Sequence, residues 1–159
     1  MAQGMIRVMV AEDVELLLED FCDIVDQELD MEVVGAASSG QQICALAQEK
    51  DCDVILMDVE METMTAGILA AENILAEKPN IKIIFLTAHE TDSIITSAMG
   101  TGAVDYVVKG CDDAVLLDHI RRAYTDTTVL EAHIRQTVMR EYTRLHQSER
   151  SLIFFFNSV

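Results

Sequence analysis

Five polar residues stand at the ends of short apolar runs that are widely separated in the chain. They are Glu12 and Asp13 after the first run, Asp58 at the end of the third, Thr87 at the end of the fourth and Lys109 after the fifth. Three carboxylates that meet at one place repel one another and attract a hard cation, and Mg²⁺ prefers carboxylate, carbonyl and water oxygens. A carboxylate beside such a cation can also attack a phosphoryl group as a nucleophile. The residue types therefore indicate metal-assisted phosphoryl transfer.

The hydroxyl and the ammonium suit the same chemistry. In-line phosphoryl transfer needs positive charge to neutralise the oxygens of the transferred group, and the ammonium of Lys109 would add to the charge of the cation. The hydroxyl of Thr87 can donate a hydrogen bond to a further oxygen. Taken singly, each residue has an ordinary structural role, such as a helix cap or a solvated charge. The prediction therefore depends on their meeting at one place.

The apolar runs and the stretches between them predict the elements that must bring these residues together. Strands are predicted over residues 5–11, 32–36, 54–57, 81–86 and 103–108, and helices over residues 14–29, 38–49, 66–77, 91–99 and 112–124. Ser38 or Ser39 suits the N-cap of the second helix. Continuous apolar runs are typical of strands in a parallel sheet that is covered on both faces. We therefore expect one doubly wound α/β domain over residues 4–124, with its ligand site at the carboxyl ends of the strands.

Residues 125–159 follow a different pattern. A helical stripe of apolar side chains runs through them at Leu130, Ile134, Val138, Tyr142 and Leu145. Such a stripe either packs back on its own domain or pairs with another copy of the chain. We therefore expect a C-terminal extra helix that serves as a linker or a dimerisation helix.

The charge balance argues against several classes of partner. Acidic residues outnumber basic ones 28 to 11, which gives a formal charge of −17 and a pI near 4.3. Residues 1–109 contain 21 of the acidic residues and only 5 of the basic ones, so this part of the chain would repel phosphate backbones and anionic lipids. We expect the chain by itself to bind neither nucleic acid nor membranes.

Other features of the sequence favour the cytoplasm. No apolar run approaches the ~20 residues of a membrane span, and the N-terminal residues become acidic too early for a secretory signal peptide. The four cysteines are scattered and lack the paired spacing of a zinc site, as is typical of reduced thiols.

Four segments of the chain resemble the signature segments of response regulator receiver domains, in the same order and spacing. They are VMVAEDVELL, VILMDVEM, IFLTAHE and GAVDYVVKG. The resemblance extends over about residues 5–124. It implies the CheY-like form of the flavodoxin-like fold, with five parallel strands in the order 2-1-3-4-5.

The resemblance also implies a role for each residue of the site. Asp58 matches the phosphoacceptor. Glu12 and Asp13 match the acidic pair that holds Mg²⁺ together with Asp58 and the backbone carbonyl of Glu60. Such receivers accept a phosphoryl group from a histidine kinase, and they catalyse their own Mg²⁺-dependent phosphorylation and dephosphorylation without being turnover enzymes.

Three further positions match the residues that respond to phosphorylation. Thr87 matches the switch hydroxyl that turns toward the phosphoryl group, and Lys109 matches the lysine that pairs with that group. Tyr106 matches the switch aromatic, whose ring turns inward when the threonine moves. In such receivers the change spreads to the face that is made by the fourth helix, the fifth strand and the fifth helix, which is also a possible surface for a homodimer.

The chain departs from the common receiver pattern at three positions. Glu12 stands where aspartate is commoner, Glu62 stands where many receivers have proline, and Gly110 follows the lysine where proline is frequent. A lysine followed by glycine is nevertheless familiar in receivers of the LuxR/NarL type. In those regulators a linker helix leads to a helix-turn-helix domain, so we expect this sequence to end before such an output domain. DNA would then be bound only through a domain that this sequence lacks.

Three functions are compatible with these residues. The leading hypothesis is a phosphorylatable receiver of a two-component system that controls transcription. The second is a receiver-like module that binds proteins without being phosphorylated. The third is an aspartate-nucleophile phosphatase, a class that carries Asp-x-Asp on its first strand, whereas here Asp58-Val59-Glu60 follows the third.

Overall fold

The computed structural model describes residues 4–88, 92–125, 140 and 144. Strands and helices alternate along this part of the chain. In order they are β1 (Ile6–Ala11), α1 (Glu15–Asp26), β2 (Met31–Ala37), α2 (Gly40–Glu49), β3 (Val54–Asp58), α3 (Ala66–Glu77), β4 (Lys82–Thr87), α4 (Asp92–Met99), β5 (Asp105–Val108) and α5 (Asp113–Thr125). All ten predicted elements are found. The first helix ends at Asp26 rather than at residue 29, and Leu29 is 97% exposed.

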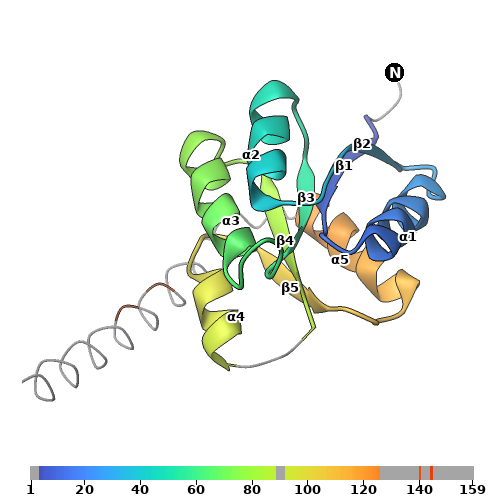
Figure 1. Cartoon of the computed structure of the whole chain (residues 1–159). Helices are drawn as coiled ribbons and strands as arrows, with labels where there is room; N and C mark the ends of the chain where they lie inside the picture. Colours follow the sequence, from blue (N-terminus) through green and yellow to red (C-terminus); the bar gives the residue numbers. More distant parts are fainter. Residues whose placement is uncertain (1–3, 89–91, 126–139, 141–143, 145–159) are drawn as a thin grey trace, which may run out of the picture.

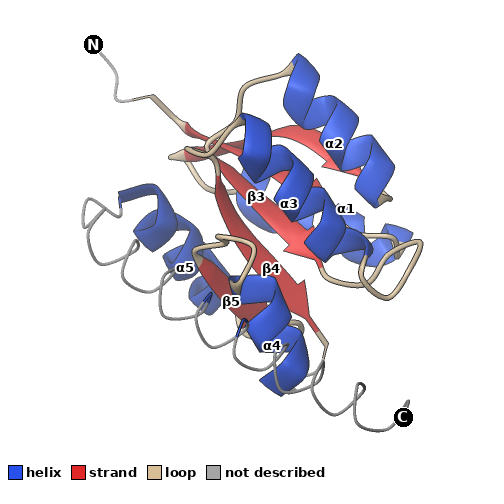
Figure 2. Ribbon diagram, turned by 90° about the vertical axis from the view of Figure 1, so that its left-hand side faces the viewer, coloured by secondary structure: helices blue, strands red, loops and turns tan. Residues whose placement is uncertain are grey.

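The five strands form one parallel sheet in the order β2-β1-β3-β4-β5. Helices α1 and α5 cover one face of the sheet, and α2, α3 and α4 cover the other (Figures 1 and 2). The predicted doubly wound fold and the strand order that the resemblance implied are both confirmed.

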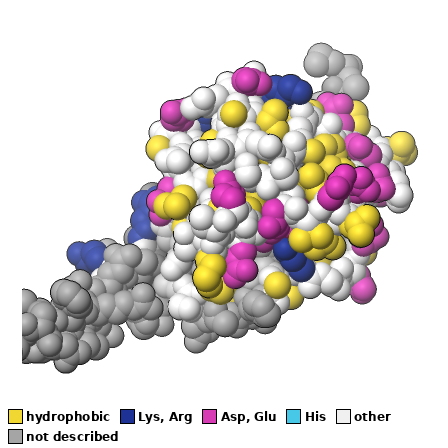
Figure 3. Space-filling view, viewed as in Figure 1, with side chains coloured by type: hydrophobic (Ala, Val, Ile, Leu, Met, Phe, Trp, Pro, Cys, Tyr) yellow, Lys and Arg dark blue, Asp and Glu magenta, His cyan; other side chains and the backbone are white. Residues whose placement is uncertain are grey.

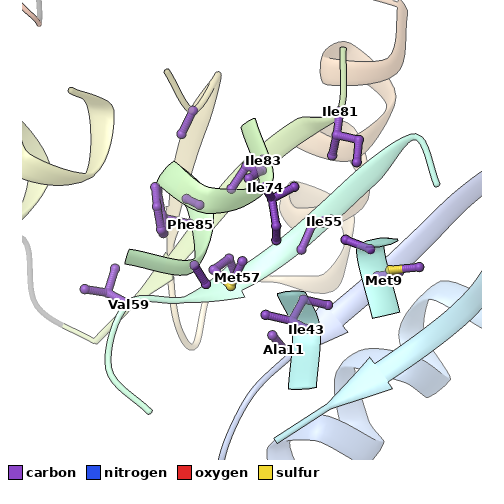
Figure 4. Close-up of a cluster of buried hydrophobic side chains, with 14 of the residues drawn as sticks. Met9, Ala11, Ile43, Ile55, Met57, Val59, Ile74, Ile81, Ile83 and Phe85 are labelled. Carbon is purple, nitrogen blue, oxygen red and sulfur yellow. The ribbon is translucent and has the colours of Figure 1, made fainter. Parts of the chain in front are cut away.

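The hydrophobic core is divided by the sheet into two clusters. Alternate residues of β1, β3 and β4 point to opposite faces, so that Val10 and Leu56 pack with α1 and α5, whereas Met9 and Ile55 pack with α2 and α3. Figure 4 shows the second cluster, with Ile43 of α2 and Ile74 of α3 against strand residues such as Phe85. Because both faces are buried, these strands have apolar residues at successive positions instead of alternating ones.

The N-terminus of α2 is capped twice, once by its own flanking residue and once from a distant loop. Ser39 Oγ accepts a hydrogen bond from Gln42 N at 3.1 Å, which confirms a serine N-cap. Glu62, in the loop after β3, accepts from Gly40 N at 2.7 Å and from Gln41 N at 3.3 Å. The hydrogen bond from Gly40 is the largest cause of a lowered pKa of Glu62. Glu62 thereby connects the β3–α3 loop to α2.

Helix α3 begins unusually close to the end of β3. Gly67 N donates to Val59 O at 2.9 Å, and a Cβ at Gly67 would lie 1.9 Å from the carbonyl oxygen of Asp58. Only a residue without a side chain allows this approach. Gly67 therefore helps to fix the backbone that carries Asp58.

The expected C-terminal helix cannot be compared with the structure. Its stripe from Leu130 to Leu145 lies outside the described residues, and the domain boundary near residue 124 stays a prediction. Among the helices that are described, none combines the length and the apolar character that a membrane-spanning helix needs.

Replacing Gly67 with alanine should destabilise the domain, because the added methyl group would force α3 away from the end of β3. We expect the free energy of unfolding, measured by urea denaturation, to fall by about 1–3 kcal/mol. Gly4→Ala is the control, since nothing lies within 4 Å of a Cβ at that position. An unchanged unfolding free energy for Gly67→Ala would contradict the close approach of α3 to Asp58.

Candidate functional site

Four strands deliver the predicted site residues to one edge of the sheet. Asp58 is the last residue of β3 and Thr87 is the last residue of β4, while Glu12 and Lys109 come directly after β1 and β5. Because the strands are parallel, their carboxyl ends lie on the same side of the sheet (Figure 2). The meeting of residues from four distant stretches, which the sequence predicted, is confirmed for Glu12, Asp58 and Lys109 by direct contacts.

Three carboxylates gather at this edge. Ligand oxygens of Glu12, Asp13 and Asp58 all lie within 4.8 Å of one another. Glu12 is fully buried and Asp58 is 3% exposed, whereas Asp13 faces solvent. This arrangement offers a cation two buried carboxylates and one that remains open to water, which suits the partly hydrated coordination that Mg²⁺ prefers.

Lys109 reaches between the two buried carboxylates. Its Nζ lies 2.6 Å from Glu12 Oε1 and 3.1 Å from Asp58 Oδ2. Its own backbone N–H donates to Thr87 O at 2.8 Å, which ties the ends of β4 and β5 together. Burial alone would lower the pKa of Lys109, but the two carboxylates outweigh it and raise the pKa. The ammonium therefore stays charged.

The remaining oxygens of the buried pair are held by the backbone. Val14 N donates to Glu12 Oε2 at 3.2 Å, and Glu60 N donates to Asp58 Oδ1 at 3.2 Å. Glu12 Oε1 and Asp58 Oδ2 are buried, and both are paired with the Lys109 ammonium. The buried carboxylates therefore depend on this one ammonium for their charge balance.

Burial and the closeness of the three carboxyls shift their pKa values in different directions. Burial, followed by the neighbouring Glu12, raises the pKa of Asp58 to about 8. Burial and Glu12 also raise the pKa of Asp13. For Glu12, burial favours the neutral form, but hydrogen bonds with Asp58, Lys109 and the Val14 N–H outweigh it and lower the pKa. Without a cation, the cluster thus favours a charged Glu12 and a protonated Asp58.

The two predicted switch residues lie on neighbouring strands. Thr87 is buried at the end of β4, and Tyr106 of β5 pairs in register with Phe85 of β4. Tyr106 is half-buried and packs against the core cluster on the α2–α3–α4 side of the sheet. Its position between core and solvent is compatible with a ring that moves, but its switching role stays a prediction.

Sequence reasoning missed two contacts near the site. The Asp105 carboxylate accepts from Tyr106 N and pairs with His119 of α5, which joins β5 to α5 beside the switch aromatic. The Glu62 carboxylate joins the loop after Asp58 to α2. Neither contact follows from a periodic pattern, because each depends on how a loop or strand packs against a distant helix. The bond between Lys109 and Gly110 is trans, and Gly110 has a positive φ of 91°.

The family model of the response regulator receiver domain matches residues 8–121. The chain belongs to this family. It is 35% identical over 147 residues to the uncharacterized transcriptional regulatory protein YxjL of Bacillus subtilis, a match that covers 92% of the chain and 67% of the relative. It is 34% identical over 148 residues to the transcriptional regulatory protein LiaR of the same species, covering 93% of the chain and 69% of the relative.

Solved structures agree with this assignment. The response regulator domain of Thermotoga maritima CheB is 33% identical and superposes with a TM-score of 0.69, covering 76% of this chain and 96% of that one. A LuxR-family DNA-binding response regulator from Staphylococcus aureus shares the fold with a TM-score of 0.71 at 21% identity, covering 76% of this chain and all of that one. This receiver is related to transcriptional regulators. It spans 61% of the length of VraR of Staphylococcus saprophyticus and 60% of the length of DegU of Brevibacillus brevis.

The surface of the receiver is strongly acidic. Figure 3 shows acidic side chains spread over the face in view, with few basic ones between them. Positions 1–109 contain 21 acidic and 5 basic residues, so the net charge of this part of the chain is negative, like that of the cluster of Glu12, Asp13 and Asp58. Such a field raises the local concentration of cations and repels free polyanions.

Replacing Asp58 with asparagine should stabilise the cation-free receiver. Burial and Glu12 raise the pKa of Asp58 to about 8, so folding near neutral pH must either add a proton to this carboxyl or bury its charge, whereas asparagine is neutral in both states. We expect the unfolding free energy near neutral pH to rise by about 1–2 kcal/mol. Added Mg²⁺ should stabilise the wild-type chain against heat and should have a much smaller effect on the variant. Asp20→Asn, on the exposed face of α1, is the charge-matched control. A variant that is less stable and responds fully to Mg²⁺ would contradict the three-carboxylate site.

Proposed function

We propose that this receiver accepts a phosphoryl group from a histidine kinase on Asp58 and works as a cytoplasmic switch that controls transcription through an output domain. The single observation that carries the proposal is the position of the Lys109 ammonium, 2.6 Å from Glu12 and 3.1 Å from Asp58 beside the third carboxylate, Asp13. This arrangement supports a site at the carboxyl edge of the sheet in which a nucleophilic carboxylate, a cation and a fixed positive charge would act together.

The residues that would hold Mg²⁺ are Glu12, Asp13, Asp58 and the backbone carbonyl of Glu60. When bound, Mg²⁺ would supply positive charge to the oxygens of the transferred group and would favour the ionised form of Asp58. Both oxygens of Glu12 are already engaged, one by Lys109 and one by Val14 N–H. Glu12 therefore serves mainly as the anchor of the lysine and as a source of negative charge, and Asp13 is the more accessible ligand.

The transfer step itself needs little from the protein beyond position and charge. A carboxylate oxygen of Asp58 attacks the phosphorus, a new O–P bond forms, and the P–N bond to the imidazole of the kinase breaks as its electron pair returns to the ring. The Lys109 ammonium neutralises an oxygen of the incoming group, and the Glu60 N–H holds the other oxygen of the Asp58 carboxyl.

The response would then pass along β4 and β5. The hydroxyl of Thr87 turns toward the phosphoryl group, the ring of Tyr106 follows, and the face made by α4, β5 and α5 changes. This face, or the C-terminal segment, would serve as the surface of a homodimer. Support for the path comes from the register that places Phe85 of β4 beside Tyr106 of β5 and from the hydrogen bond between Lys109 N and Thr87 O.

Phosphorylation by a small phosphodonor tests this function directly. We expect acetyl phosphate with Mg²⁺ to label Asp58 once per chain, as detected by mass spectrometry of the intact protein, and we expect no label on Asp58→Asn. Lys109→Ala should slow labelling by at least about tenfold, because a charge that meets the developing oxyanion is lost. Asp20→Asn should label at the wild-type rate.

The same experiment separates the alternatives. A folded chain that binds Mg²⁺ but never acquires the label would favour a binding module that acts without phosphorylation. Repeated release of phosphate from a phosphomonoester would favour the aspartate-nucleophile phosphatase. A label that persists on Asp58→Asn would refute the assignment of Asp58 as the acceptor.

A further inference from the structure

The loop between β3 and α3 carries two of the groups that the site needs. Glu60 N donates to Asp58 Oδ1 at 3.2 Å, and the carbonyl of the same residue belongs to the proposed cation ligands. Val59 N donates to Leu86 O at 3.1 Å, which fixes the start of the loop, and further along both Met61 N and Ala66 N donate to Thr63 O, at 3.0 and 3.3 Å. The position of the loop after Met61 also depends on what its residues contact outside the loop.

Glu62 supplies such a contact. Its carboxylate accepts hydrogen bonds from Gly40 N at 2.7 Å and Gln41 N at 3.3 Å, the first two amides of α2. The partial positive charge at the start of a helix strengthens hydrogen bonds to an anion. The approach is close, because a Cβ at Gly40 would lie 3.0 Å from Ala66 O and 3.4 Å from Glu62 Oε2. The loop and the start of α2 are thus packed and hydrogen-bonded to each other.

We infer that Glu62 is a positioning residue of the phosphorylation site. It holds the β3–α3 loop so that the Glu60 N–H can donate to Asp58 and the Glu60 carbonyl can bind the cation. The inference deepens the proposed function and rests on it. Glu62 touches neither Asp58 nor the transferred group. It acts on them through Met61, the one residue that separates it from Glu60.

A purely structural role for Glu62 can be separated from this positioning role, because α2 has a second cap. Ser39 Oγ accepts from Gln42 N at 3.1 Å and stabilises the same helix end, but Ser39 is not part of the β3–α3 loop. Loss of either cap should weaken the start of α2. Only loss of the Glu62 cap should also release the loop that carries Glu60.

The test compares Glu62→Ala, Glu62→Gln and Ser39→Ala in the full chain. Hydrogen exchange of the Glu60 amide, measured by NMR, reports the loop without any reference to phosphorylation. The Kd for Mg²⁺, measured by calorimetry, and the initial rate of labelling by acetyl phosphate report the site. The midpoint of thermal unfolding shows whether Glu62→Ala and Ser39→Ala lose similar amounts of stability.

We expect Glu62→Ala to speed exchange at Glu60, to raise the Kd for Mg²⁺ by about fivefold and to slow labelling by a similar factor, as the loss of a charged cap would do if its effect passed to the loop. Glu62→Gln, which keeps one acceptor oxygen, should lie between Glu62→Ala and the wild type. Ser39→Ala should lower thermal stability while leaving exchange at Glu60 and the Kd close to wild type.

Equal effects of Glu62→Ala and Ser39→Ala on the Kd and on exchange at Glu60 would overturn the inference, and so would wild-type values for Glu62→Ala. A wild-type chain that neither binds Mg²⁺ nor takes the label would instead overturn the proposed function. In that case exchange at Glu60 alone still decides whether Glu62 holds the loop.

Discussion

The contact of one ammonium with two buried carboxylates is the interaction on which the site depends. Glu12 and Asp58 are almost wholly removed from solvent, and two adjacent carboxylates in such surroundings cannot both carry charge without a nearby cation. Lys109 provides one positive charge for the pair. The cluster with Asp13 is still left with excess negative charge, which would attract a divalent cation.

The contact depends on the order of the strands in the parallel sheet. Residues 12, 58 and 109 are far apart in the chain, and only the placement of β1 beside β3, with β4 and β5 following, brings their strand ends to one edge. Burying the charged groups costs folding free energy, and the burial of the apolar side chains of β1, β3 and β4 offsets this cost. Apolar residues in place of Glu12, Asp58 and Lys109 would suit these buried positions at least as well, so packing does not explain why charged residues lie there.

The sequence was most informative where one physical rule acts alone. Helix α3 was predicted with its observed bounds, because an apolar helical pattern ends just before the proline at position 79, and Asp58 and Lys109 were predicted because polar residues end apolar runs. The strand order came from the family resemblance, since periodicity does not determine which strands are neighbours. The hydrogen bond between Glu62 and Gly40 of α2 was not predictable, because it joins residues 22 positions apart and depends on how the β3–α3 loop packs against α2.

The same geometry explains how a change at Asp58 would reach the opposite side of β5. The Lys109 amide donates a hydrogen bond to Thr87 O, so the residue that is proposed to pair with a phosphoryl group is attached to the strand that carries the proposed switch hydroxyl. A phosphoryl group on Asp58 would compete with Glu12 for the Lys109 ammonium, since the group carries more charge than the carboxylate it modifies. Because the backbone of Lys109 is bonded to Thr87, a shift of Lys109 would affect the ends of both β4 and β5. Tyr106, tied through Asp105 to His119 of α5, lies where this movement would meet α5.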